Sequence, residues 1–110
     1  MAQLPRVCIT VTGATVEEML GQARHAAGAS RFVELRLDYL ANPARSPEAV
    51  QTVRRARIAC IATLRSAAAG GKFEGSAEDQ LHILEKAGLA GARLVDLEIE
   101  SAEHLGARAV

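Results

Sequence analysis

Two kinds of segment alternate along this chain, and the alternation constrains its fold more than any other feature. Short runs of β-branched and aliphatic residues are separated by longer alanine-rich stretches in which apolar residues recur with helical spacing. This order is typical of a parallel α/β fold, because each helix returns the chain to the end of the sheet where the next strand begins. We predict strands over residues 6–12, 31–37, 58–64 and 94–99.

Capping residues mark where the intervening helices begin. Thr15 and Glu18 have the Thr-x-x-Glu spacing at which a hydroxyl and a carboxylate satisfy free backbone amides at a helix start. Ser46 followed by Pro47 predicts a serine cap with proline at the first helical position. The other predicted boundaries are helix ends near Gly28 and Gly88, a helix start over residues 76–79, and a fourth helix over 101–109.

The predicted strands start about every 25 to 35 residues, close to the length of one β/α unit. Four such units over residues 1–110 form either half of a TIM-type (β/α) barrel or a small open sheet. Periodicity alone does not separate these two architectures.

The charge balance limits the kinds of partner. Thirteen basic residues offset thirteen acidic ones, so no long-range field attracts nucleic acid or an anionic membrane, and a small neutral or anionic metabolite fits better. Residues 1–7 lack the pattern of a signal peptide, and no apolar stretch reaches membrane-spanning length, so we expect a cytoplasmic protein. Lys72 and Lys86 are the only lysines, which limits where an imine could form.

Cysteine and histidine give no sign of a metal centre. We expect Cys8 and Cys60, both in apolar runs, to be reduced core residues rather than a disulfide pair. His25, His82 and His104 lack metal-ligand spacing and are expected at the surface or at helix ends. We therefore expect neither a metal nor a cofactor.

Charged residues occupy alternate positions of three predicted strands, so that one face of each strand is polar and the other apolar. Parallel strands are usually apolar on both faces, and an isolated buried charge is costly. In a barrel, such charges would point into the interior near the carboxyl ends of the strands, where substrates bind. Alternatively, they pair with each other or lie on a solvated sheet edge. The polar positions are Glu34, Arg36 and Asp38; Thr63 and Arg65; and Asp96, Glu98 and Glu100.

A glycine pair, Gly70-Gly71, follows the third predicted strand. Glycine at this position can bring backbone amides close to an anion, but no Gly-Lys-Ser/Thr follows, so the phosphate signal is weak. A flexible barrel loop is the favoured interpretation.

Three segments, in this order and spacing, resemble the type I 3-dehydroquinate dehydratases: residues 33–40 (VELRLDYL), residues 63–65 (TLR) followed by Gly70-Gly71, and residues 95–98 (VDLE). The resemblance covers nearly the whole chain but only about the first half of that family's barrel. Similar barrels are often fused to shikimate dehydrogenase, and the sequence leaves open whether this one is.

The resemblance implies an imine mechanism. In that family a lysine on a later strand forms an imine with the ketone of 3-dehydroquinate, and a histidine on the preceding strand removes the proton before water is expelled, giving 3-dehydroshikimate in the shikimate pathway. An imine is an electron sink for this step. By resemblance, Glu34, Arg36 and Arg65 hold the substrate's ring hydroxyls, and Thr10 lies near them. Supporting roles fall to Asp38, Asp96 and Glu98.

The sequence departs from the family's pattern in two ways. Ala69 stands where the family usually has a glutamate that orients the catalytic histidine, which predicts less efficient proton transfer. The histidine and lysine of the later strands have no match here, so we expect no catalytic residue in this chain and no activity from it alone. Glu74 is the one nearby carboxylate that could replace the missing glutamate.

Three hypotheses remain. The chain is a piece of a dehydratase; or it is a non-catalytic half barrel that binds a ligand or pairs with another copy; or it is another barrel enzyme with coincidental motifs. Half a barrel leaves two strand edges open, which favours association with a missing half or with a second copy of the chain.

Overall fold

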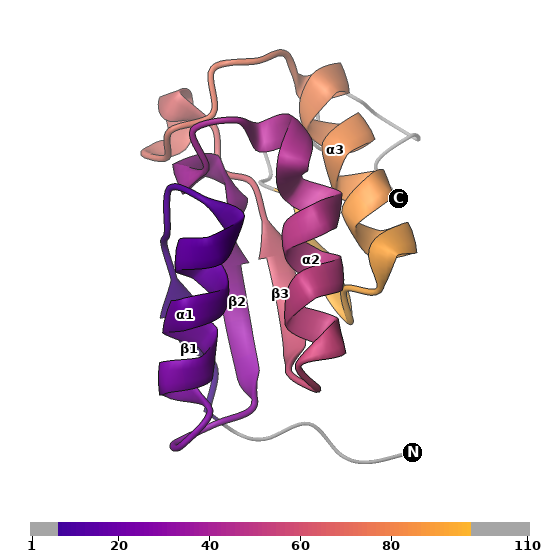
Figure 1. The fold of residues 1–110 in the computed structure, drawn as a ribbon. Helices are drawn as coiled ribbons and strands as arrows, with labels where there is room; N and C mark the ends of the chain where they lie inside the picture. Colours follow the sequence, from indigo (N-terminus) through magenta and orange to yellow (C-terminus); the bar gives the residue numbers. More distant parts are fainter. Residues whose placement is uncertain (1–6, 98–110) are drawn as a thin grey trace.

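The computed structural model describes residues 7–97 of the chain and has the alternating order that the sequence predicts (Figure 1). The strands are β1 (Ile9–Val11), β2 (Phe32–Arg36), β3 (Ala59–Thr63) and β4 (Leu94–Asp96). The α-helices are α1 (Val16–Ala26), α2 (Ser46–Arg55) and α3 (Ala77–Ala90), and the short 3-10 helices are η1 (Leu37–Tyr39), η2 (Pro43–Arg45) and η3 (Ala67–Ala69). The predicted helix over 101–109 lies outside the described residues.

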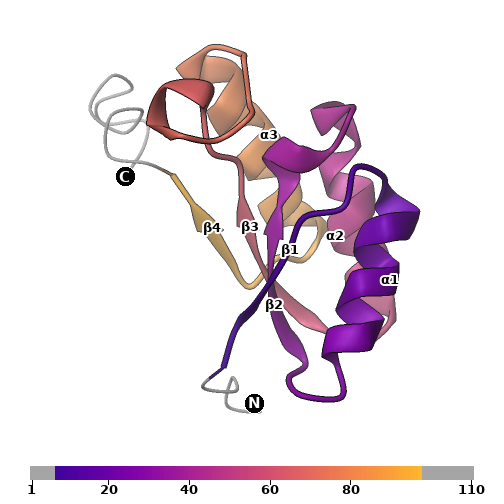
Figure 2. The same ribbon diagram turned by 90° about the vertical axis from the view of Figure 1, so that its left-hand side faces the viewer.

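The four strands form one parallel sheet in the order β1-β2-β3-β4. Each strand therefore lies beside the next one in the chain, as in a barrel. The three α-helices cover one face of the sheet, and the opposite face carries no helix of the described chain (Figures 1 and 2). The prediction of parallel β/α units is confirmed.

The core lies between the sheet and these helices. Alternate strand residues point toward the helices and are fully or almost fully buried, which explains the apolar half of each strand pattern. The sheet contributes Val11, Val33, Leu35, Cys60 and Ala62, and the helices contribute Met19, Ala23, Val50, Val53, Leu84 and Ala87.

The three predicted helices within the described residues begin where the sequence indicates, and two of the three predicted caps are confirmed. The Thr15 hydroxyl accepts a hydrogen bond from the Glu18 amide, and Ser76 and Asp79 form a capping box at the start of α3. The predicted serine cap of α2 is wrong, because Ser46 already has helical backbone angles and its hydroxyl donates to the Pro43 carbonyl. The preceding turn η2, capped by Asn42, begins the helical path earlier.

The prediction that both cysteines are core residues is half wrong. Both thiols are free, and Cys60 is buried, but Cys8 is exposed. Cys8 lies two residues before Thr10, so it belongs to the sheet face that no helix of the described chain covers (Figure 2). Burial, together with the nearby Cys8, raises the pKa of the Cys60 thiol to about 11. Cys60 is therefore protonated at neutral pH and a poor nucleophile.

The end of α2 has an arginine where glycine is usual. The Arg57 amide donates to the Arg54 carbonyl (2.8 Å) and the Ile58 amide to the Val53 carbonyl (3.3 Å), the two bonds of a Schellman motif. Arg57 has a φ of 62°, which is left-handed backbone that disfavours a Cβ atom.

Replacing Arg57 with glycine is expected to raise the free energy of unfolding by about 0.5–1 kcal/mol, since relief of the left-handed strain exceeds the extra chain entropy that glycine loses. Urea unfolding of the two proteins measures this difference. A glycine variant no more stable than the parent would show that Arg57 makes compensating contacts.

No helix in the described part of the chain is both long and apolar enough to cross a membrane.

Candidate functional site

Polar side chains from three neighbouring strands meet on one face of the sheet. Thr10 pairs in register with Glu34, and Glu34 lies beside Ile61, two residues before Thr63 on β3. The Glu34 carboxylate accepts hydrogen bonds from the Thr10 hydroxyl (3.1 Å) and the Thr63 hydroxyl (2.8 Å). Because Val33 and Leu35 point into the helix-covered core, this cluster lies on the opposite face. A carboxylate has about four acceptor positions, so Glu34 retains capacity for a ligand's hydroxyls.

Arg36 and Asp38 form a two-point ion pair just beyond this cluster. The Arg36 guanidinium donates through Nε (2.9 Å) and Nη2 (2.8 Å) to the two oxygens of Asp38. The sequence placed Asp38 on the same strand face as Arg36, but β2 ends at Arg36 and Asp38 belongs to η1. The turn still brings the two side chains together, and it buries the aspartate.

Hydrogen bonds keep the buried Asp38 ionised. Burial alone would raise the pKa of its carboxyl, but hydrogen bonding and charge attraction from Arg36 outweigh burial and hold that pKa below its ordinary value. The Lys72 amide also donates to Asp38 (3.1 Å). This bond ties the loop over residues 65–75 (the glycine loop) to the end of β2. Hydrogen bonding to Asp38 in turn raises the pKa of Arg36. Arg36 is therefore a fixed cation.

Arg65 is held much more loosely. Its Nη2 lies 3.9 Å from a carboxylate oxygen of Asp96, and the two side chains are 39% and 50% exposed. An exposed ion pair at this separation contributes little to stability. The backbone before Arg65 is nevertheless fixed, because buried Gln80 on α3 donates to the Leu64 carbonyl (2.6 Å). Arg65 thus combines an anchored backbone with a guanidinium that a ligand can recruit.

The glycine loop is compact and closed by backbone hydrogen bonds. The Ala67 amide donates to the Phe73 carbonyl, and the Phe73 amide donates to the Arg65 carbonyl. Gly70 has a φ of 91°, and a Cβ atom at Gly71 would collide with the Arg65 backbone. These two requirements explain the glycine pair without a bound phosphate.

Three residues that the sequence reasoning did not assign to the site belong to its surroundings. Thr63 is buried and donates a hydrogen bond to Glu34. Its position two residues before Arg65, on the same strand face, could have indicated from the sequence that it belongs to the site. The Tyr39 ring lies 5.2 Å from the Arg36 guanidinium carbon and 5.1 Å from the Lys72 ammonium, within cation-π range. No local pattern links Lys72 with Tyr39, because the loop alone brings them together. Of the predicted residues, Glu98 lies outside the described part of the chain.

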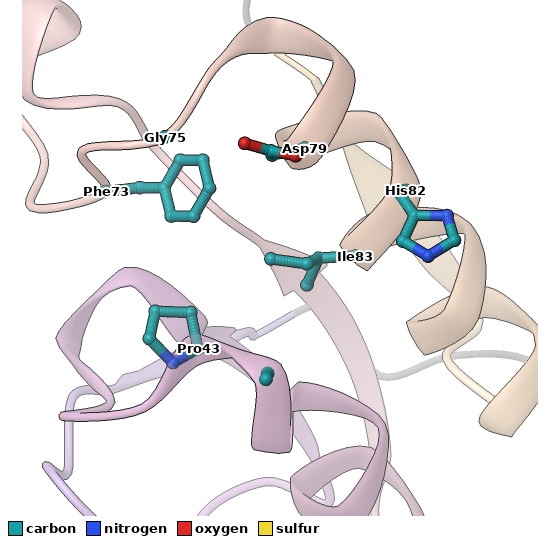
Figure 3. Close-up of a pocket in the computed structure, with 7 residues that line it drawn as sticks. Pro43, Phe73, Gly75, Asp79, His82 and Ile83 are labelled. Carbon is teal, nitrogen blue, oxygen red and sulfur yellow. The ribbon is translucent and has the colours of Figure 1, made fainter.

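A pocket of about 390 Å³ lies elsewhere, between η2, the glycine loop and α3. Figure 3 shows Pro43 on one side of it, with Phe73, Asp79 and Ile83 on the other. The Asp79 carboxylate already caps α3, so it offers little to a ligand. This pocket shares no residue with the polar cluster on the open face.

The fold and the polar cluster together define a class. Parallel β/α units in sequential order, with carboxylate, hydroxyl and guanidinium groups at or near the carboxyl ends of the strands, are the building units of TIM-type barrel enzymes, and this chain contains four of the strands. The sequence model of the family described as "Type I 3-dehydroquinase" matches residues 7–110. The chain belongs to the type I 3-dehydroquinase family.

Individual relatives agree with this assignment. The chain is 36% identical over 106 residues to 3-dehydroquinate dehydratase of Coxiella burnetii, covering 96% of this chain and 45% of the relative. It is 39% identical over 102 residues to 3-dehydroquinate dehydratase of Dehalococcoides mccartyi, covering 93% of this chain and 41% of the relative. The chain thus spans less than half the length of these two curated relatives.

Solved structures agree on the fold. A 3-dehydroquinate dehydratase from Enterococcus faecalis superimposes with a TM-score of 0.76 and 25% identity over 96% of this chain and 49% of that protein. A type I 3-dehydroquinate dehydratase from Clostridium difficile gives a TM-score of 0.79 over 93% of this chain and 43% of that protein, and at 19% identity it supports the fold alone. The described strands therefore correspond to part of a TIM-type barrel.

Proposed function

We propose that this chain forms the substrate-orienting half of a 3-dehydroquinate dehydratase, which converts 3-dehydroquinate to 3-dehydroshikimate and water in the shikimate pathway. The observation that carries the proposal is the Thr10–Glu34–Thr63 hydrogen-bond cluster. Arg36 follows at the end of β2, and Arg65 follows two residues after the end of β3. A hydroxylated ring with a carboxylate needs both acceptors and cationic donors, and these residues provide both.

Each polar group has a distinct role in the proposed site. The Glu34 carboxylate accepts hydrogen bonds from ring hydroxyls, and the two threonines fix its orientation. Arg65 donates to the substrate, while Asp38 fixes the Arg36 guanidinium. Asp96, 3.9 Å from Arg65, supports that arginine electrostatically. Groups held in position before the substrate arrives reduce the entropy lost on binding.

The imine chemistry belongs to the other half of the barrel. By resemblance, the lysine and the histidine lie on later strands. Lys72 occupies the glycine loop beside Tyr39, and Lys86 is exposed on α3, so neither is on a strand. We therefore propose that this chain orients the substrate but does not form the imine, and that Ala69 leaves the histidine without its usual carboxylate partner.

Borohydride trapping tests this division of roles. With 3-dehydroquinate and sodium borohydride, intact mass spectrometry is expected to show no adduct on the 110-residue chain. A protein that continues the barrel with the lysine-bearing strand is expected to gain one adduct, because borohydride reduces an imine to a stable amine. An adduct on Lys72 or Lys86 would contradict the proposal, as would the absence of an adduct on the longer protein.

In the described part of the chain, β4 is the last strand of the sheet, and this edge favours association with further β/α units. Leu94 and Val95 are 55% and 47% exposed, although their strand partners on β3 are largely buried. An uncovered strand edge with apolar side chains favours pairing. We propose that the rest of the barrel covers this edge, and that the chain alone pairs with a second copy, which light scattering would detect as a dimer. Such a dimer without substrate binding would favour a non-catalytic half barrel.

A further inference from the structure

Arginines gather at the end of the sheet opposite the polar cluster. Arg31, Arg57 and Arg93 each precede a strand by one or two residues, at the starts of β2, β3 and β4. The strands are parallel neighbours, so these three residues share one edge of the sheet. Backbone bonds from the Ala59 amide to the Arg31 carbonyl and from the Arg93 amide to the Cys60 carbonyl (both 2.9 Å) join these strand starts.

The chain segments at this edge carry basic residues but no acidic ones. The strand starts and the ends of the helices that lead to them, residues 24–31, 52–59 and 87–93, contain no aspartate or glutamate. In residues 7–97, no carboxylate forms an ion pair with the side chain of Arg54 or Arg57. Two guanidinium groups without a carboxylate partner in that part of the chain, those of Arg54 and Arg57, would attract an anion placed near them.

Three of the arginines line a defined pocket. Arg54, Arg57 and Arg93 surround a space of about 270 Å³, together with Ile58, Ala59 and Gly91. Gly91 has a φ of 120°, and a Cβ atom there would collide with Cδ of Arg54. The glycine therefore lets the Arg54 side chain lie against the end of α3. Three cationic side chains thus line one space together with three buried or half-buried uncharged residues.

Helix electrostatics explain only part of this arrangement. Arg54 and Arg55 lie in the last turn of α2, where a positive charge is favourable near the carbonyl ends. That effect does not require Arg57, whose left-handed backbone a glycine would adopt without strain. It also does not explain why Arg93 approaches from a different element. A strained residue whose side chain lines a pocket is better explained by what that side chain binds.

We propose that this arginine pocket binds an oxyanion of the phosphate class, either the free ion or the phosphoryl group of a small metabolite. Guanidinium groups offer paired donors that match the oxygens of phosphate, and the pocket's volume suits a group of this size. The pocket is formed at the amino ends of the strands, so its residues are separate from Glu34, Arg36 and Arg65. The inference therefore does not depend on the proposed dehydratase function.

Calorimetric titration of the 110-residue chain tests the proposal. The probes are inorganic phosphate, pyrophosphate and glucose 6-phosphate, at an ionic strength held constant with sodium chloride. We expect saturable binding of at least one probe with one site per chain. Tighter binding of glucose 6-phosphate than of phosphate would identify a phosphorylated metabolite as the ligand, and equal binding would identify the free ion. An absence of saturable binding for all three probes would overturn the proposal.

Two variants distinguish binding in the pocket from attraction by the overall positive charge of this edge. Arg54→Gln is expected to weaken binding by roughly tenfold, in line with the loss of a charge-assisted contact. Arg55→Gln is the matched control, because Arg55 lies on the same turn of α2, carries the same charge and does not line the pocket. It is expected to change affinity by less than about twofold. Equal losses in the two variants would overturn the pocket.

Arg57→Gly adds a readout that a purely structural role would not give. This variant is expected to melt at a higher temperature and yet to bind the same probe roughly tenfold more weakly, since strain is relieved while one guanidinium is lost. Opposite effects on stability and on affinity cannot result from partial unfolding. Unchanged affinity in a more stable Arg57→Gly protein would remove Arg57 from the site.

Discussion

Replacing Asp38 with alanine is expected to lower the free energy of unfolding by about 3 kcal/mol, the scale measured when one member of a buried ion pair is removed. Asp38 is buried, and its two oxygens accept hydrogen bonds from Arg36 and from the Lys72 amide. Its loss leaves the Arg36 guanidinium without its partner and releases the glycine loop from the end of β2. Urea unfolding at neutral pH measures the difference.

The same residue gives a pH dependence of known sign. Because folding lowers the pKa of Asp38 from its ordinary value of 3.8, its contribution to stability is complete above that value. The contribution is lost as the pH falls through the lower, folded-state pKa. Asp38→Asn is therefore expected to lose stability at pH 7 and to depend less on pH between about 5 and 2 than the parent does.

A matched control is Glu85→Ala on the exposed face of α3, which is expected to change stability by less than about 0.5 kcal/mol. If Asp38→Ala and Glu85→Ala are equally stable, the Arg36–Asp38 pair contributes nothing to the fold.

Replacing Arg65 with alanine, in a protein that completes the barrel, is expected to lower kcat/KM for 3-dehydroquinate by more than about tenfold. Arg65 carries the most loosely held guanidinium of the cluster, since among residues 7–97 its one ion pair is with Asp96, at 3.9 Å. A loosely paired cation can transfer its hydrogen bonds to a substrate without breaking a strong ion pair. Steady-state kinetics with the purified variant give the ratio directly.

Arg24→Ala provides the comparison, because Arg24 is exposed in the last turn of α1, which leads to the start of β2 at the end of the sheet opposite the cluster. It is expected to keep kcat/KM within about twofold. Arg65→Lys should recover part of the loss, since lysine keeps the charge but not the paired donors. Unchanged kinetics in Arg65→Ala would remove Arg65 from the proposed site.

The sequence predicted the strands and helices well because their signals are local. Each strand carries its own alternation, and Thr15 and Ser76 cap their helices with side chains three residues from their partners. The predictions failed where two local signals compete. Ser46 precedes a proline, as a helix cap often does. The 3-10 helix η2, capped by Asn42, already starts the helical backbone at Pro43, so Ser46 lies inside the helical path. The third helix passes Gly88 and ends where Gly91 adopts a positive φ.

The site was predictable only in part, for a related reason. Strand alternation and register place Glu34 near Thr10, because both lie at fixed positions along neighbouring strands. The burial of Asp38 and the approach of Lys72 to Tyr39 depend on how η1 and the glycine loop fold over the end of β2. Such turns do not follow the period of a strand. Cys8 was placed in the core because of its apolar neighbours, although strand alternation puts it on the same face as Thr10.

The contact between Gly71 and the Arg65 backbone bears on how this protein could be altered by selection. Any side chain at position 71 displaces the segment that carries Arg65, whereas the neighbouring Ala67 and Ala68 are exposed and accept larger residues. A mutant library that keeps position 71 constant and randomises 67 and 68 would vary the rim of the cluster without moving its guanidinium. The loop thus combines a glycine pair that must be kept with two exposed alanines that can be varied, and new substrate preferences could be sought at those alanines.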